Sequence, residues 1–309
     1  MIDKKGFQGF YTYTFYSCIK IKNPSYLRQR IRKQANNLKI IGTIILTQEG
    51  INSTISSKTK NNLNMMISLL ENQFGPIRFR ESFSKKQPFK RLKVKVRKEV
   101  VPSGTNILIK KDLNNYIDPE NWNDFIKDDS VLLIDVRNNY EVEVGTFVNS
   151  ISPETKTFKE FNNFIEESKK DFKNKKLGIF CTGGIRCEKA SALFNEKGIN
   201  DVYQLEGGIL NFFKNNKNKD NFKGECFVFD DRVTVDKNLN PGGFFQCFAC
   251  RRPLSKDDLS RPEYTEGISC HNCINEKTDK DRERFADRHK QNLLKSCLLY
   301  TSDAADEQW

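Results

Sequence analysis

Long apolar runs are missing from this 309-residue chain. No stretch approaches the ~20 consecutive apolar residues that a membrane-spanning helix needs. The first residues, Met1 to Lys5, include an aspartate and two lysines and lack the apolar run of a secretory signal. We therefore expect a protein that has no membrane contact and resides in the cytoplasm.

Histidine is also scarce, because the chain has only His271 and His289, both near its C-terminus. An iron centre made of two histidines and one carboxylate would need both of them. The sequence also lacks the G-x-G-x-x-G fingerprint of a dinucleotide-binding fold. These absences indicate that the protein has no flavin or nicotinamide motif.

Cysteine, in contrast, occurs nine times. Six of the nine fall in compact local motifs, which is the wrong pattern for a scattered disulfide framework. We therefore expect reduced thiols, available for metal binding or for chemistry, in a reducing compartment.

The positive charge is concentrated in the first third of the chain. Residues 1–112 contain 23 lysines and arginines against 6 acidic residues, which leaves 29 against 34 for the other residues. The total net charge of +12 therefore comes from this segment alone. Such asymmetry is typical of a protein that binds a polyanion.

The densest positive charge lies in residues 85–98, with eight basic residues and no acidic one. Leu92, Val94 and Val96 alternate with cations there, so a strand would turn the cations to one face. This pattern favours contact with a phosphate backbone, and the alternative is a solvated edge strand whose lysines block aggregation. The predicted phosphate contacts are Lys85, Lys86, Lys90, Arg91, Lys93, Lys95, Arg97 and Lys98.

Patterns of apolar residues predict a multidomain chain of mixed α/β and α+β class. Residues 1–112 show the order βαββαβ of a ferredoxin-like (acylphosphatase-like) domain. Residues 113–216 alternate buried strands with helices, which predicts an α/β domain with a parallel sheet. A cysteine-rich region follows over 217–295 and ends in a charged helix near 277–291. Residues 296–309 do not continue the helical pattern, and we interpret them as a disordered or artefactual tail.

The candidate catalytic residue is Cys181, which follows a buried strand and precedes a helix. A sulfur atom there would face backbone N–H groups and a helix N-terminus, both of which favour an anion and lower a thiol pKa. Two glycines permit the tight loop, and an arginine adds positive charge. The loop residues after the cysteine are Thr182, Gly183, Gly184, Ile185 and Arg186.

Three further residues are assigned a supporting role. Asp135 and Arg137 end the preceding buried strand. Cys187 directly follows the loop, and it is either a second thiol that resolves an intermediate on Cys181 or a packing residue at the helix start.

A second cysteine group lies near the C-terminus. Cys247 and Cys250 form one C-x-x-C pair, and Cys270 and Cys273 form another, with 19 residues between them. This spacing predicts one tetrahedral zinc ion held by four thiolates, and such a saturated site is structural. His271 is interpreted as a neighbour of the site.

The central segment resembles a rhodanese domain over residues 114–216. The resemblance is carried by Asp135-Val136-Arg137, by the loop from Cys181 to Arg186, and by Glu206-Gly207-Gly208-Ile209. In that family the cysteine carries a persulfide, so the resemblance places the nucleophile at Cys181. Four residues separate the cysteine from the arginine, one fewer than in related phosphatases, which counts against a phosphatase.

Taken together, residues 9–291 resemble one family, the rhodanese-like tRNA uridine 5-hydroxylases. Matching stretches include Glu49-Gly50-Ile51-Asn52, Tyr140-Glu141-Val142, the segment 224–233 and the segment 250–255. The resemblance implies oxygen-dependent hydroxylation at C5 of the wobble uridine, position 34 of certain tRNAs. It also implies molecular oxygen as co-substrate and the anticodon region of tRNA as partner.

Two other functions are compatible with the residues. One is a sulfurtransferase that carries a persulfide from thiosulfate or a donor protein into tRNA thiolation or a sulfur relay. The other is a non-enzymatic RNA-binding module with a decayed rhodanese, although the intact loop argues against decay. A sulfur-donor or electron-donor protein would be a further partner, and nothing indicates the oligomeric state.

Overall fold

The computed structural model describes residues 9–105, 107, 109 and 115–306, with side chains described up to residue 294. The chain divides into two compact units, residues 1–242 and residues 243–309. No helix in the described ranges is both long enough and apolar enough to cross a bilayer.

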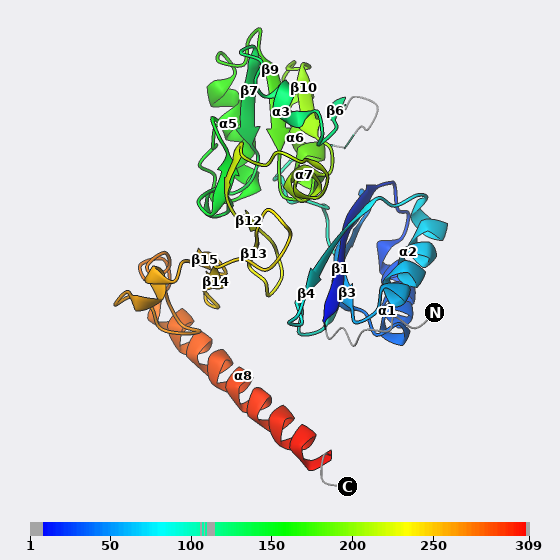
Figure 1. Ribbon diagram of the computed structural model, residues 1–309, viewed down its shortest axis with the longest axis vertical. Helices are drawn as coiled ribbons and strands as arrows, with labels where there is room; N and C mark the ends of the chain where they lie inside the picture. Colours follow the sequence, from blue (N-terminus) through cyan, green and yellow to red (C-terminus); the bar gives the residue numbers. More distant parts are fainter. Residues whose placement is uncertain (1–8, 106, 108, 110–114, 307–309) are drawn as a thin grey trace. The chain divides into compact units, whose positions relative to one another are not determined.

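The N-terminal domain is a five-stranded sheet with two helices on one face (Figure 1). Its elements are β1 Phe10–Cys18, α1 Pro24–Asn37, β2 Ile41–Thr47, β3 Gly50–Ser57, α2 Lys60–Phe74, β4 Phe79–Ser84 and β5 Leu92–Val96. The strand order is β4-β1-β3-β2-β5, in which β5 runs parallel to β2 and the other neighbours are antiparallel. The predicted βαββαβ order is confirmed, and the basic stretch adds a fifth strand at one edge.

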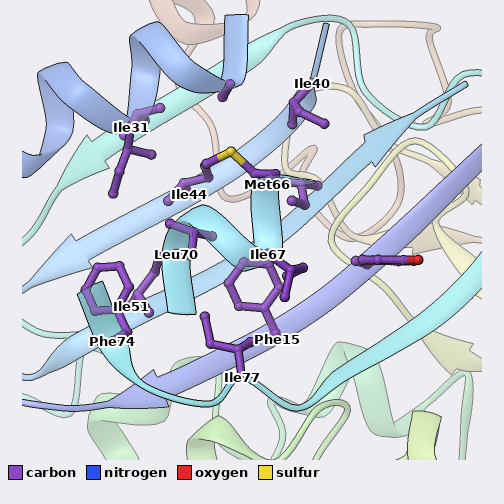
Figure 2. Close-up of a cluster of buried hydrophobic side chains, with 14 of the residues drawn as sticks. Phe15, Ile31, Ile40, Ile44, Ile51, Met66, Ile67, Leu70, Phe74 and Ile77 are labelled. Atoms are coloured by element: carbon purple, nitrogen blue, oxygen red, sulfur yellow. The ribbon is translucent and has the colours of Figure 1, made fainter. Parts of the chain in front are cut away.

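The core of this domain lies between the sheet and the two helices. Side chains alternate along β2, so Ile44 and Leu46 are fully buried on the helix side of the sheet. Figure 2 shows Ile44 and Phe15 of the sheet among Ile31 of α1 and Met66 of α2. The opposite face of the sheet is therefore not covered by these two helices.

The second domain is an α/β domain whose sheet has the order β6-β10-β9-β7. All paired strands of this sheet are parallel, as predicted. Its elements are β6 Asn115–Ile117, α3 Trp122–Phe125, β7 Val131–Asp135, α4 Asn139–Val142, β8 Gly145–Phe147, the 3-10 helix Phe158–Glu160, α5 Phe161–Ser168, β9 Lys176–Phe180, α6 Ile185–Glu196, β10 Val202–Leu205 and α7 Gly208–Asn215.

This sheet is buried on both faces. Ile179 of β9 packs with Phe161 and Phe194 on one side, while Phe180 packs with Trp122 and other aromatic rings on the other side. Burial on both faces is usual for a parallel sheet. It brings the carboxyl ends of the central strands to one edge, where ligands of such folds gather.

Residues 217–242 belong to the first unit. They form β11 Phe222–Gly224, which pairs with β8, and the short pair β12 Cys226–Phe227 and β13 Thr234–Val235. The contacts therefore divide the chain at Gly242, beyond the domain boundary predicted at residue 216.

The second unit contains the short strands β14 Phe245–Gln246 and β15 Pro253–Leu254, the 3-10 helix Asp257–Ser260 and the long helix α8 Asp279–Asp306. The interpretation of residues 296–309 as a tail outside the helical pattern is wrong up to Asp306, because α8 continues to that residue. The reason is composition, since residues 277–309 contain neither glycine nor proline, and leucine and alanine propagate a helix well.

Candidate active site

The cysteine loop connects the end of β9 to the start of α6. Gly184 adopts a φ of 98°, which L side chains rarely adopt, so glycine is required there. At Gly183 a Cβ atom would meet only Thr14 Cγ2 at 3.9 Å. The loop therefore needs glycine for its backbone at 184, whereas glycine at 183 leaves open space beside the N-terminal domain.

The Cys181 sulfur is held by hydrogen-bond donors, as the sequence predicted. The Gly184 N–H group donates to Sγ over 3.1 Å. Burial by itself raises the pKa of Cys181, but the Cys187 thiol, the Arg186 charge and nearby N–H groups outweigh it and lower the pKa to about 5. Cys181 is therefore a thiolate at neutral pH.

Cys187 behaves in the opposite way. Its side chain is fully buried, and burial together with its hydrogen bond to Cys181 raises the pKa of Cys187 well above the ordinary value. Cys187 thus acts as the donor in the pair and stabilises the thiolate of Cys181. The two predicted alternatives for Cys187, resolving thiol or packing residue, both stay open.

The Arg186 guanidinium is bound by a residue that the sequence did not single out. It donates two hydrogen bonds, of 2.5 and 2.7 Å, to the fully buried carboxylate of Glu141. Glu141 also accepts the N–H of Asn138 at 3.3 Å, at the start of α4. Its carboxylate therefore fixes Arg186 beneath the loop and compensates part of the positive charge.

Asp135 and Arg137 form a buried ion pair at the end of β7. Their side chains are fully buried, and the pair is bidentate with its shortest contact at 2.6 Å. Arg137 also donates to the Gly145 carbonyl at 2.6 Å, and Thr146 donates to Asp135 at 2.7 Å. These contacts tie β7 to β8, so the geometry gives the pair a structural role in supporting the site.

A cavity of about 570 Å³ borders the cysteine loop and is lined by both domains. Its walls comprise Cys181 and neighbouring loop residues, the free face of the N-terminal sheet, and the segments 100–102 and 228–232. The volume lies within the roughly 300–1,000 Å³ of small-molecule sites. Cys181 itself is only 1% exposed, so reagents reach its sulfur through this cavity.

The sheet wall of the cavity has a cation at each end. Paired residues of neighbouring strands point to the same face of a sheet. Thr14, Thr54 and Thr43 form one such row across β1, β3 and β2, and all three line the cavity. The row continues to Arg80 on β4 and to Lys93 on β5. Positive charge therefore flanks the wall that faces the cysteine.

The basic stretch forms the edge of the same wall. All eight predicted phosphate contacts are exposed, whereas Val94 between two of them is buried. A second row, Tyr16, Asn52 and Ile45, ends in Lys95, and Phe89 from the basic stretch also lines the cavity. The predicted alternation is thus confirmed in an edge strand, and contact with phosphate stays a prediction.

The four cysteines of the second unit come together as predicted. The Sγ atoms of Cys247, Cys250, Cys270 and Cys273 all lie within 4.8 Å of one another, and His271 is not a member of the group. Individual separations are 4.0, 3.8 and 3.7 Å. Four sulfurs about 2.3 Å from a tetrahedral zinc ion would be roughly 3.8 Å apart. The group therefore fits a structural zinc ion.

Comparison with protein families assigns both domains of the first unit. Residues 10–100 match the UPF0176 acylphosphatase-like domain, and residues 118–215 match the rhodanese-like domain. The chain is therefore a rhodanese-domain protein with an acylphosphatase-like domain before the rhodanese. These two domains in this order are the architecture of the UPF0176 (TrhO) family.

Solved structures resemble single parts of the chain. A rhodanese-related protein from Thermoplasma volcanium is 25% identical and covers 32% of this chain and 91% of its own, with a TM-score of 0.27. A rhodanese-like domain from Anabaena is 12% identical over 36% and 80% of the two chains, with a TM-score of 0.30. An acylphosphatase from Coxiella burnetii is 13% identical over 31% and 100%, with a TM-score of 0.22.

Several residues of the site escaped the sequence analysis. Glu141 and the segment 228–232 were noted there only as parts of a family resemblance, and Lys159 at the cavity was not noted. Tyr16 and Glu49 were not linked to α6, although they contact Glu188 and Lys189 there. The available clue was the charged pair Glu188-Lys189, which stands in α6 between the small or apolar residues Cys187 and Ala190.

Proposed function

We propose that the protein hydroxylates C5 of the wobble uridine, position 34, in tRNA, with molecular oxygen as co-substrate and Cys181 as the reacting residue. One observation carries the proposal. The cavity that contains the Cys181 thiolate has the free sheet face of the most basic domain as its opposite wall. A polyanionic substrate attracted by that domain would therefore meet the nucleophile.

The thiolate has a specific use in this reaction. It adds to C6 of the uracil ring, and the electrons of the C5–C6 double bond move to C5, which becomes nucleophilic. C5 then takes up O2 and one proton to give a hydroperoxide. Two electrons and two protons from an external donor, a protein or a small thiol, convert it to C5–OH and water. Loss of the C5 proton expels the Cys181 thiolate and restores the double bond.

RNA binding is supported by the charge and by the cavity. Phosphate contacts from lysine and arginine supply most of the affinity for nucleic acid and make it salt-dependent. Unpaired bases of an anticodon loop can be splayed into a protein pocket. The exposed cations of β5 lie on the face that bears the cavity, so a loop held there would present its bases to Cys181.

The test is reaction of purified protein with tRNA in the presence of a reductant, under air and under argon. The proposal expects 5-hydroxyuridine with the wild type under air only, and none with Cys181→Ser. Oxygen-18 gas should label the new hydroxyl group. Product that forms equally under argon, or with the serine variant, contradicts the proposal.

The second candidate is a sulfurtransferase, and the hydrogen bond from the Gly184 N–H group to Sγ favours it because the same donors would hold a persulfide. The Cys181 thiolate would take the outer sulfur of thiosulfate and release sulfite. Transfer of this sulfur to an acceptor restores the thiolate. Thiocyanate release from thiosulfate and cyanide, without hydroxylation of tRNA, would select this function over the first.

A further inference from the structure

An exposed aromatic ring stands at the cavity that contains Cys181. Phe229 is 61% exposed and lines this cavity. It follows β12, in the segment between β12 and β13. Single exposed apolar side chains are common on protein surfaces, so the position of this ring at the cavity, and not its exposure alone, makes it a candidate contact for a ligand.

The ring is held in place by its neighbours. It packs edge-on against the buried Phe227, with centroids 5.1 Å apart, and Phe227 packs edge-on against Tyr140 at 5.3 Å. The Arg186 guanidinium lies 5.7 Å from the centroid of Phe229. The exposed ring is thus connected through Arg186 to the loop that holds Cys181.

The segment that carries the ring is also fixed to the N-terminal domain. Arg232 forms a buried bidentate pair with Asp230 and donates to the Ser82 hydroxyl of β4 at 2.6 Å. The N–H group of Asp231 donates to the Pro88 carbonyl at 2.9 Å. A loop with these contacts on both sides does not collapse over the cavity, so Phe229 is presented as a rigid surface.

The residues around Phe229 indicate which kind of partner the ring contacts. Pro88 lies within the basic stretch, between Lys86 and Lys90, and the exposed Lys159 lies at the cavity as well. An aromatic ring that has Arg186 close to it, at a cavity that Lys159 also lines, matches single-stranded nucleic acid, in which each base has a face to stack and a phosphate to pair. An apolar protein segment would find no complement for these charges.

We propose that Phe229 is a stacking platform for an unpaired nucleobase next to the uridine that enters the cavity. This inference rests on the RNA substrate of the proposed function. The reacting uridine must reach Cys181, which is nearly inaccessible from outside, whereas Phe229 is open to solvent and therefore meets the flanking base. Stacking on Phe229 would hold the strand while one nucleotide turns inward.

The experiment measures binding of an anticodon stem-loop RNA by variants of the full chain. Phe229→Ala and Phe229→Leu should each weaken binding about tenfold, the size of one base–aromatic stack, because leucine keeps the bulk and loses the π-face. Phe229→Trp should bind as the wild type. Tyr26→Ala is the matched control, because Tyr26 on α1 is also 61% exposed and does not line the cavity.

Fluorescence of the Phe229→Trp variant separates this inference from the proposed reaction. RNA should quench the new tryptophan, measured against the wild type, and an abasic site beside the target uridine should abolish the quenching. An abasic site at the target uridine should leave it intact. Quenching that is indifferent to the flanking base, or wild-type affinity of Phe229→Leu, overturns the inference even if hydroxylation occurs. If the quenching depends on the flanking base but no hydroxylated product forms, the stacking role of Phe229 is supported and the proposed hydroxylation is refuted.

Discussion

The Tyr16 hydroxyl donates a hydrogen bond of 2.7 Å to the carboxylate of Glu188, and so joins β1 of the N-terminal domain to the helix that follows the cysteine loop. Glu188 is only 2% exposed and also accepts from Tyr116 at 3.1 Å. Burial and the Glu188 carboxylate raise the pKa of Tyr16 well above its usual value, so the phenol keeps its proton.

Tyr16→Phe should therefore destabilise the first unit. The substitution leaves the buried carboxylate of Glu188 with fewer donors, and loss of a hydrogen bond to a charged group costs about 1–3 kcal/mol. Urea unfolding followed by circular dichroism measures the free energy of unfolding. Tyr26→Phe, at an exposed position on α1, should change it little. Equal stability of the Tyr16 and Tyr26 variants would show that this contact does not support the domain pairing.

Alkylation of Cys181 should follow the titration of a thiolate with a pKa near 5. Only the thiolate attacks iodoacetamide, so the rate should rise as the pH increases through about 5 and level off before neutrality. Mass spectrometry of the peptide that contains Cys181 distinguishes this site from the other cysteines. Arg186→Met removes the positive charge, so its profile should move toward higher pH. An unshifted profile, or a wild-type midpoint near pH 8 to 9, would contradict the described environment.

Neutralisation of Lys93 and Lys95 should weaken tRNA binding and reduce its dependence on salt. Both lysines lie in the rows of the sheet wall that lines the cavity. Each phosphate contact contributes about 0.7–0.9 to the slope of log affinity against log salt, so the double glutamine variant should lower the slope by roughly 1.5. Lys170→Gln with Lys173→Gln, exposed lysines of the rhodanese domain, is the matched control. An identical slope for both double variants would remove β5 from the RNA-binding surface.

The purified protein should contain one zinc ion per chain, held in the second unit. Cys247→Ser removes one of four thiolates and should reduce the zinc content severalfold, as measured by atomic emission on dialysed protein. Cys18→Ser, outside the cysteine group, should retain zinc. A chelator strong enough to remove the ion should reduce the ordered structure of residues 243–309 and spare the first unit. Full zinc content in Cys247→Ser would exclude this site.

The parts of the site that could be predicted are those encoded by adjacent residues. In the loop from Cys181 to Arg186, and in each of the two C-x-x-C pairs, the reactive or ligating residues lie within a few positions of one another. Their spacing in the sequence therefore predicted that they come together in the structure. Alternation around Val94 likewise predicted which cations of β5 are exposed. Apolar periodicity does not predict the extension of α8 to Asp306, because that part of the helix depends on helix propensity.

The contacts that could not be predicted join residues distant in the chain. Glu141 reaches Arg186 across 45 positions, and Tyr16 reaches Glu188 across 172. Phe229 is exposed at the cavity only because its segment is held between Ser82 and Pro88 of the other domain. Such relationships depend on the tertiary fold, and a hydrophobic pattern assigns a phenylalanine to the core by default.

Val100 and Val101 are both buried and line the cavity, and the N–H group of Val100 donates to Glu49 at 2.9 Å. The segment that leaves the N-terminal domain therefore forms part of the cavity wall as well as connecting the two domains. An insertion at Val100 or Val101 would open the wall of the cavity. Each of the two domains, if expressed separately, would contain only part of the cavity.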